Sequence, residues 1–184
     1  LTPYLKGEKT GKVFGVTFDD GFRNVYVNAL PVLTELGFTS TNYLVVNQFD
    51  GGNVWDADNN IPFSPLMTIA EAKAWSKAGQ EIGSHTLDHV DLPQVSQEEA
   101  RQQITLSRHI LSDTVEQEVT AFCYPYGHFA PEHTEMVVQA GYENATTTRR
   151  GLAGPHDKPF ILPRVGVWRT THLLRFFQKC LTGH

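Results

Sequence analysis

The sequence lacks the features that mark membrane-spanning, nucleic-acid-binding or disulfide-stabilised proteins. No apolar segment is long enough to span a bilayer. The net charge of −5 and the isoelectric point near 5.9 argue against a surface for nucleic acid or anionic membranes. There are only two cysteines, Cys123 in a strand-like run and Cys180 in a helical one, and we expect two buried thiols rather than a disulfide. The chain shows no signal peptide and does not begin with Met, which is consistent with a trimmed fragment and leaves its location open.

What the sequence does contain is a repeated order of helix, glycine and strand. Three helix-like segments each end at a glycine and are followed by a strand-like run: 25–36 before 38–46, 70–78 before 80–83, and 132–140 before 142–147. Capping boxes at Thr68 with Glu71 and at Ser96 with Glu99 mark two helix starts, and the second opens the longest predicted helix, 97–111. A final helix is expected over 171–181.

This alternation predicts an α/β fold with parallel strands. At 184 residues we expect one domain, 1–184. A distorted or incomplete β/α barrel is the favoured architecture, and an open doubly wound sheet is the alternative. In either case a functional site is expected beyond the carboxyl ends of the strands.

Two adjacent acids provide the first indication of chemistry. Asp19 and Asp20 follow the apolar run 13–18, which has the composition of a buried strand. Burying unpaired carboxylates is costly, so we expect a partner beside them, and a metal ion is the favoured one.

Further polar residues follow two other predicted strands. His85 and His89 lie in G-S-H-T-L-D-H, and Tyr126 lies in Y-P-Y-G after the apolar run 119–123. One carboxylate and two imidazoles suit a hydrolytic Zn²⁺ site with open positions, and the same set suits a non-haem Fe(II) site. A lone H-x-x-x-H pair is a weak signal by itself, because such pairs often lie on solvated helices. The convergence of three strand ends is the stronger evidence.

The motifs T-F-D-D-G, S-H-T-L-D-H and Y-P-Y-G, in this order, resemble those of the polysaccharide deacetylases of the NodB type, carbohydrate esterase family four. The resemblance covers about residues 13–167. It implies a distorted β/α barrel that removes acetyl groups from N-acetylated sugars with one divalent metal, usually zinc, in the cell envelope or outside the cell. It also implies roles for five residues: Asp19 as catalytic base, Asp20, His85 and His89 as metal ligands, and Tyr126 as the donor of a backbone N–H to the oxyanion.

The sequence departs from this family pattern in two places. Cys123 stands where the family usually has an arginine that pairs with the catalytic aspartate, and we expect Arg164 in L-P-R-V-G-V to replace it. The family's late Leu-x-His motif is missing, so the general acid is unassigned, with His128, His156 and His172 as weak candidates.

The segment 47–67 is too long for an ordinary connection and lies at the active end of its strand. Trp55 and Phe49 are expected either to stack on sugar rings at the rim of the site or to pin the loop down. Trp75, in a helical pattern, is expected in the core.

These observations lead to one functional hypothesis and two alternatives. The hypothesis is a metal-dependent hydrolase that removes N-acetyl groups from an N-acetylglucosamine-type glycan, with Asp19 as the base on a water. One alternative is a catalytically silent relative that binds carbohydrate or metal, against which the intact Asp19 argues. The other is an iron-dependent oxygenase, which the alternating pattern disfavours because oxygenases with these ligands usually fold as β sandwiches. The identity of the polymer and the oligomeric state are left open.

Overall fold

The computed structural model describes residues 4, 7–11, 13–154 and 156–183. Within this part, six parallel strands form one sheet in chain order, each paired with the next. The strands are β1 (Val16–Phe18), β2 (Ser40–Leu44), β3 (Glu81–Ser84), β4 (Ala121–Cys123), β5 (Asn144–Arg150) and β6 (Leu162–Arg164).

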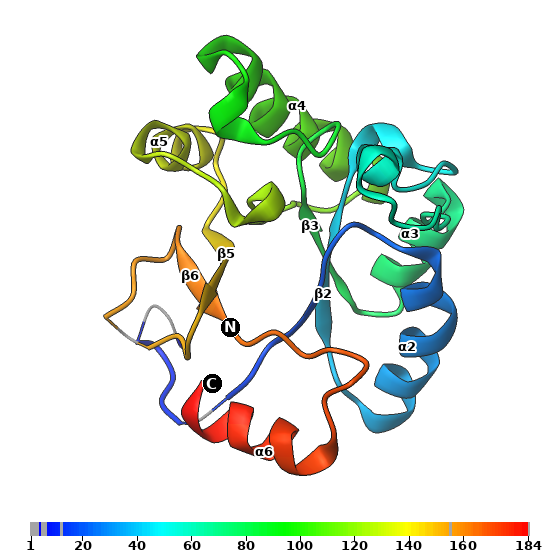
Figure 1. Ribbon diagram of the computed structural model, residues 1–184, viewed down its shortest axis with the longest axis vertical. Helices are drawn as coiled ribbons and strands as arrows, with labels where there is room; N and C mark the ends of the chain where they lie inside the picture. Colours follow the sequence, from blue (N-terminus) through cyan, green and yellow to red (C-terminus); the bar gives the residue numbers. More distant parts are fainter. Residues whose placement is uncertain (1–3, 5–6, 12, 155, 184) are drawn as a thin grey trace.

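The unbroken strand order explains the overall shape. Because right-handed crossovers that always advance in one direction place their helices on the same face, the sheet curls away from them. Figure 1 shows the helices α2 to α5 outside the curled strands, and α6 along the lower end. A doubly wound sheet would reverse its strand order, and this sheet does not. The prediction of an incomplete β/α barrel is therefore confirmed, in the form of a curled half-barrel.

The helices begin and end close to the predicted positions. They are α2 (Arg23–Leu36), α3 (Ile69–Lys77), α4 (Gln97–Val115), α5 (Pro131–Gln139) and α6 (Leu173–Thr182), with short 3-10 helices η1 (Val46–Gln48), η2 (Val54–Asn59), η3 (Leu92–Gln94) and η4 (Pro125–Gly127). At α3 both capping-box bonds between Thr68 and Glu71 are formed, at 3.0 Å each. At α4 the Glu99 N–H donates to Ser96 Oγ at 3.2 Å, which is one half of the predicted box.

The hydrophobic core lies between the sheet and the outer helices. Trp75 of α3 is fully buried, as predicted, and its Nε1–H donates to the Glu81 carbonyl at 3.1 Å. The expected buried strand over 13–18 is both shorter and less buried than predicted. Val13 and Phe14 lie outside the strand pairing and are exposed, and the three residues of β1 are only half-buried. None of the described helices is long and apolar enough to cross a membrane.

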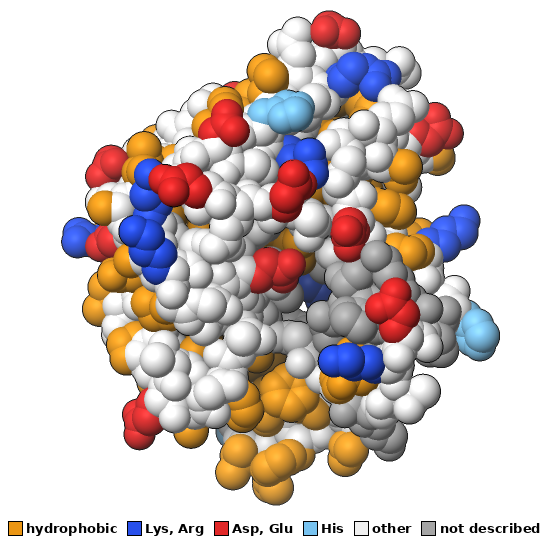
Figure 2. Space-filling model, turned by 180° about the vertical axis from the view of Figure 1, so that it is seen from behind, with side chains coloured by type: hydrophobic (Ala, Val, Ile, Leu, Met, Phe, Trp, Pro, Cys, Tyr) orange, Lys and Arg blue, Asp and Glu red, His pale blue; other side chains and the backbone are white. Residues whose placement is uncertain are grey.

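The prediction of two buried thiols is wrong for one of them. Cys123 is buried and Cys180 is exposed. The reason is the orientation of α6, whose apolar residues Leu174 and Leu181 are also exposed, while Lys179 is buried with its ammonium donating to the Gly166 carbonyl. Figure 2 shows hydrophobic side chains gathered at this lower end, and basic and acidic side chains scattered over the rest of that face.

Candidate metal centre and catalytic site

The carboxyl ends of the parallel strands bring the predicted residues to one edge of the sheet. Asp19 and Asp20 follow β1, His85 follows β3, and Arg164 ends β6. Asp20, His85 and His89 each present a ligand atom, and these atoms all lie within 4.8 Å of one another. The three residues that the sequence suggested as metal ligands are thus adjacent in space.

The hydrogen bonds of the cluster show that it suits a cation. The Asp20 Oδ1 atom lies 3.3 Å from Nε2 of His85 and 3.4 Å from Nε2 of His89. His85 Nδ1 lies 2.7 Å from the Cys123 carbonyl oxygen, and because a carbonyl only accepts, Nδ1 carries the proton. A neutral His85 then points the lone pair of Nε2 at a carboxylate oxygen. Two acceptors at this distance require a positive charge between them, either a proton or a metal ion.

The electrostatics agree with this geometry. Burial alone would raise the pKa of Asp20, but its hydrogen bonds to His85 and His89 hold that pKa well below its usual range. Burial lowers the pKa of His89. Burial also acts to lower the pKa of His85, but Cys123, Asp20 and Asp19 together raise it well above the usual value. A charged carboxylate and a neutral imidazole are the metal-binding forms, and the surroundings of His85 favour positive charge.

The backbone of the site is strained in the way typical of functional sites. Four non-glycine residues here have a positive φ, which costs roughly 1–3 kcal/mol each: Asp20 (75°), Thr86 (70°), His89 (59°) and Tyr126 (59°). Such conformations persist only where surrounding contacts fix them. At Gly127, with φ of 75°, an added Cβ would lie 2.0 Å from Thr148 Oγ1, so the turn after Tyr126 admits only glycine without rearrangement.

Sequence reasoning missed Gln103, which holds the loop that carries both histidines. From the buried face of α4, its Oε1 accepts from the backbone N–H groups of Leu87 and Asp88 at 2.9 and 3.0 Å. Its Nε2 donates to the Asp88 carboxylate at 2.7 Å, and Asn47 donates to the other Asp88 oxygen at 2.7 Å. Asp88 is exposed, but these two hydrogen bonds fix it in place.

Arg164 lies where the sequence argument expects it. Its Nη1 and Nη2 atoms donate to the two carboxylate oxygens of Asp19 at 2.6 and 2.7 Å. Its Nε donates to the Thr147 carbonyl at 2.9 Å, and its Nη2 lies 3.3 Å from the Cys123 sulfur. Burial would raise the pKa of Asp19, but the bonds and charge of Arg164 outweigh it and lower that pKa. Asp19 is therefore an ionised carboxylate held in a fixed plane beside the candidate metal-ligand cluster.

The Arg164 contact yields a testable prediction. Arg164→Ala should lower kcat by about 10–100-fold with little change in metal affinity, because Asp19 loses two directional, charge-assisted bonds while the ligand cluster keeps its donors. Arg164→Lys should recover only part of the rate, since an ammonium group cannot bind both carboxylate oxygens in the same planar geometry. Steady-state kinetics and metal titration of the same preparations would measure both effects. An unchanged kcat for Arg164→Ala would show that Asp19 needs no such orientation.

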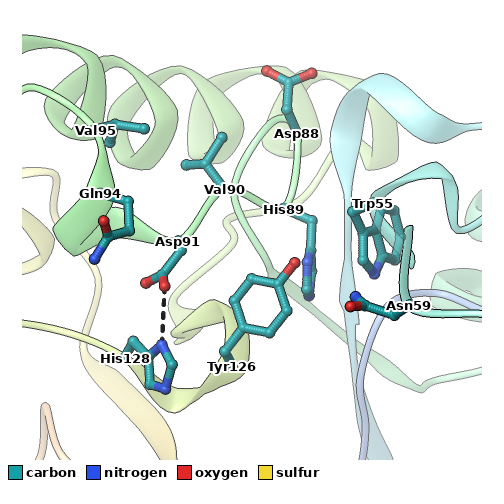
Figure 3. A pocket seen from close by; sticks show the side chains of 10 residues that line it. All are labelled: Trp55, Asn59, Asp88, His89, Val90, Asp91, Gln94, Val95, Tyr126 and His128. Atoms are coloured by element: carbon teal, nitrogen blue, oxygen red, sulfur yellow. Dashed lines mark hydrogen bonds and ion pairs between the residues drawn. The ribbon is translucent and has the colours of Figure 1, made fainter. Parts of the chain in front are cut away.

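An open hollow lies beside the cluster. Its volume is about 520 Å³, and Trp55, His89, Tyr126 and His128 are among the residues that line it (Figure 3). At the rim, His128 Nδ1–H donates to the Asp91 carboxylate at 3.1 Å. Phe49 instead packs against the core, so of the two aromatics expected at the rim only Trp55 borders the hollow.

The other histidine candidates lie elsewhere. His156 is exposed and is absent from the lining of the hollow, and His172 is the N-cap of α6, where it accepts from the Arg175 N–H at 3.4 Å. Of the three weak candidates for the general acid, only His128 borders the hollow.

Comparison with known proteins identifies relatives of this chain. The chain is 26% identical to the polysaccharide deacetylase-like protein YxkH of Bacillus subtilis over 83% of its length and 50% of that protein's. It is 23% identical to the poly-beta-1,6-N-acetyl-D-glucosamine N-deacetylase of Staphylococcus epidermidis, over 90% of this chain and 59% of the relative. The chain thus spans about half to three fifths of the length of these curated relatives.

A solved structure shares the fold. The Streptococcus pyogenes deacetylase PplD, in complex with acetate, superposes with a TM-score of 0.84 at 22% identity, over 96% of this chain and 75% of that one. The sequence profile of the family described as "Polysaccharide deacetylase" matches residues 6–145, which is more than half of the chain. The chain therefore belongs to the polysaccharide deacetylase family.

Proposed function

We propose that this chain is a metal-dependent deacetylase that removes N-acetyl groups from an N-acetylglucosamine-type glycan. The observation that carries the proposal is that the two adjacent acids have different partners. Asp20 faces the two histidines, whereas both carboxylate oxygens of Asp19 accept hydrogen bonds from Arg164. A site that only bound metal would gain nothing from a second, separately oriented carboxylate.

The geometry supports a ligand role for Asp20, His85 and His89 and a base role for Asp19. A divalent ion, of which zinc fits this donor set best, would supply a Lewis acid for the amide carbonyl and for a water. Each Asp19 oxygen accepts one bond from Arg164 and keeps a further lone pair, so the carboxylate can still accept the proton of the attacking water. Tyr126, on the turn that Pro125 begins, is proposed to direct its backbone N–H at the developing oxyanion.

The substrate proposal rests on the hollow and on the relatives. Trp55 and Tyr126 offer aromatic surface, which suits the apolar faces of sugar rings. The net charge of −5 disfavours strongly anionic polymers. The Staphylococcus epidermidis relative is named for a polymer of N-acetylglucosamine, and the proposal extends that substrate class to this chain.

The proposal is tested by measuring acetate released from a panel of substrates by the zinc-loaded protein. We expect release from β-1,4- and β-1,6-linked N-acetylglucosamine oligomers, and little from N-acetyl amino acids or small aliphatic amides. Cleavage of the amino acid derivatives alone would contradict the glycan assignment. Binding of the oligomers without any acetate release would instead support the catalytically silent alternative.

A further inference from the structure

The two histidines of the cluster are held in different ways. His85 is fixed by the bond from Nδ1–H to the Cys123 carbonyl. His89 has no such bond: its Nδ1 atom is buried and has no hydrogen-bond partner among the described residues. A metal-ligating histidine almost always donates its second ring nitrogen to an oxygen, because that bond fixes the ring plane. Something else must fix the ring of His89.

Aromatic rings surround the His89 imidazole instead. The Trp55 indole stacks on it with ring centroids 4.4 Å apart and an interplanar angle of 21°. Tyr126 approaches it edge-on at 4.6 Å and 75°, and His85 at 4.8 Å and 78°. Figure 3 shows the His89 ring between Trp55 on one side and Tyr126 on the other. Rotation of the imidazole about its own bond to Cβ would break the stacked contact.

The segment that carries Trp55 is anchored well enough to act as a support. Two residues before it, Asn53 is buried, and its side-chain oxygen accepts from the Ser64 N–H at 2.7 Å while its amide donates to Asp56 at 3.0 Å. Gly52 pairs with Pro65 in a β-bridge, and a Cβ at Gly52 would lie 2.2 Å from the Phe63 ring. The loop therefore closes on itself on both sides of Trp55.

We propose that Trp55 is the positioning residue for His89, and that its indole face replaces the missing hydrogen bond in fixing the orientation of this metal ligand. An imidazole that shares its lone pair with a cation becomes electron-poor, and the electron-rich face of an indole attracts such a ring. The indole also shields one face of His89 from water. This inference rests on the proposed metal site, and it assigns Trp55 a role that is separate from contact with a sugar.

The experiment uses Co²⁺ as the probe, titrated into the chelator-treated protein and followed by calorimetry and by the visible spectrum of the bound ion. Trp55→Leu should weaken Co²⁺ binding by roughly three- to tenfold and change the spectrum, because the His89 ring is free to turn. Trp55→Phe keeps a stacking ring and should recover most of the affinity. Val54→Ala, in the same loop, and Trp168→Leu, an exposed tryptophan that does not line the hollow, are the matched controls and should bind as the wild type does.

The possible outcomes distinguish a positioning role of Trp55 from a role in substrate contact or in loop integrity. Weaker binding for Trp55→Leu with recovery by Trp55→Phe supports the proposal. Equal binding by Trp55→Leu and wild type, with only KM for the glycan raised, overturns it and leaves Trp55 as a wall of the substrate hollow. Equal weakening by Val54→Ala also overturns it, since loop integrity would then be the cause. If the wild type binds no Co²⁺, the metal site of the proposed function is contradicted, and this inference, which rests on that site, is contradicted with it.

Discussion

Replacing Asp19 with asparagine should lower deacetylation by about 10²–10⁴-fold while metal binding is kept. The amide cannot take a proton from the attacking water. The three proposed ligands Asp20, His85 and His89 are unchanged in this variant, whereas Asp19 belongs to a second cluster, with His85 and Cys123. The amide nitrogen would also face a guanidinium N–H, because Arg164 donates to both oxygens of the native side chain. Metal analysis and kcat of the purified variant, measured at saturating metal, would show the two effects separately.

Asp19→Glu provides a second variant that keeps an acid at this position. Its longer side chain should recover some rate, because a carboxylate is again present, although it is displaced from the Arg164 fork. Near-wild-type turnover of Asp19→Asn at saturating metal would mean that another group accepts the proton of the water.

Replacing Asp20 with alanine should abolish metal binding, whereas Asp19→Asn removes the proposed catalytic base. Asp20 Oδ1 is the atom that faces both imidazoles, at 3.3 and 3.4 Å, so the variant keeps only two neutral donors. We expect metal affinity to fall by at least about 100-fold, because a charged ligand is lost outright, a larger effect than the 10–100-fold typical of outer-shell changes. Activity should fall with it, and isothermal titration with Zn²⁺ would measure the loss.

Asp91→Ala is a matched control for that change, since Asp91 is an acid at the rim of the same hollow and pairs with His128. It should bind metal as the wild type does. If Asp20→Ala kept one tightly bound metal ion per chain, the ligand set proposed here would be wrong.

The sequence predicts those parts of the site that follow directly from local patterns of apolar and polar residues. Asp19, Asp20 and His85 follow apolar strand-like runs, and the ends of parallel strands meet at one edge whatever the details of packing. Arg164 is 145 positions away from Asp19, and it could be named only because Cys123 left the acid without a partner. The contact follows from the curl of the sheet, which brings β6 towards β1.

Other features depend on packing that the sequence pattern does not encode. Gln103 is one polar residue in a helix that has several, and nothing local shows that its amide reaches the loop of His89. The stack of Trp55 on His89 arises from an irregular segment without periodicity. The sequence predicts a buried Cys180 because free thiols in helical runs are usually buried, whereas in the described part of the chain α6 turns its apolar side outward.

The central claim, a metal-dependent deacetylase, is tested most directly by titrating Zn²⁺ into the chelator-treated protein while acetate release from N-acetylglucosamine oligomers is measured. The account predicts no release without metal, and a rise in release that saturates at one equivalent of Zn²⁺ per chain. Release at full rate in the presence of chelator, or one bound Zn²⁺ with no acetate from any oligomer, would contradict it.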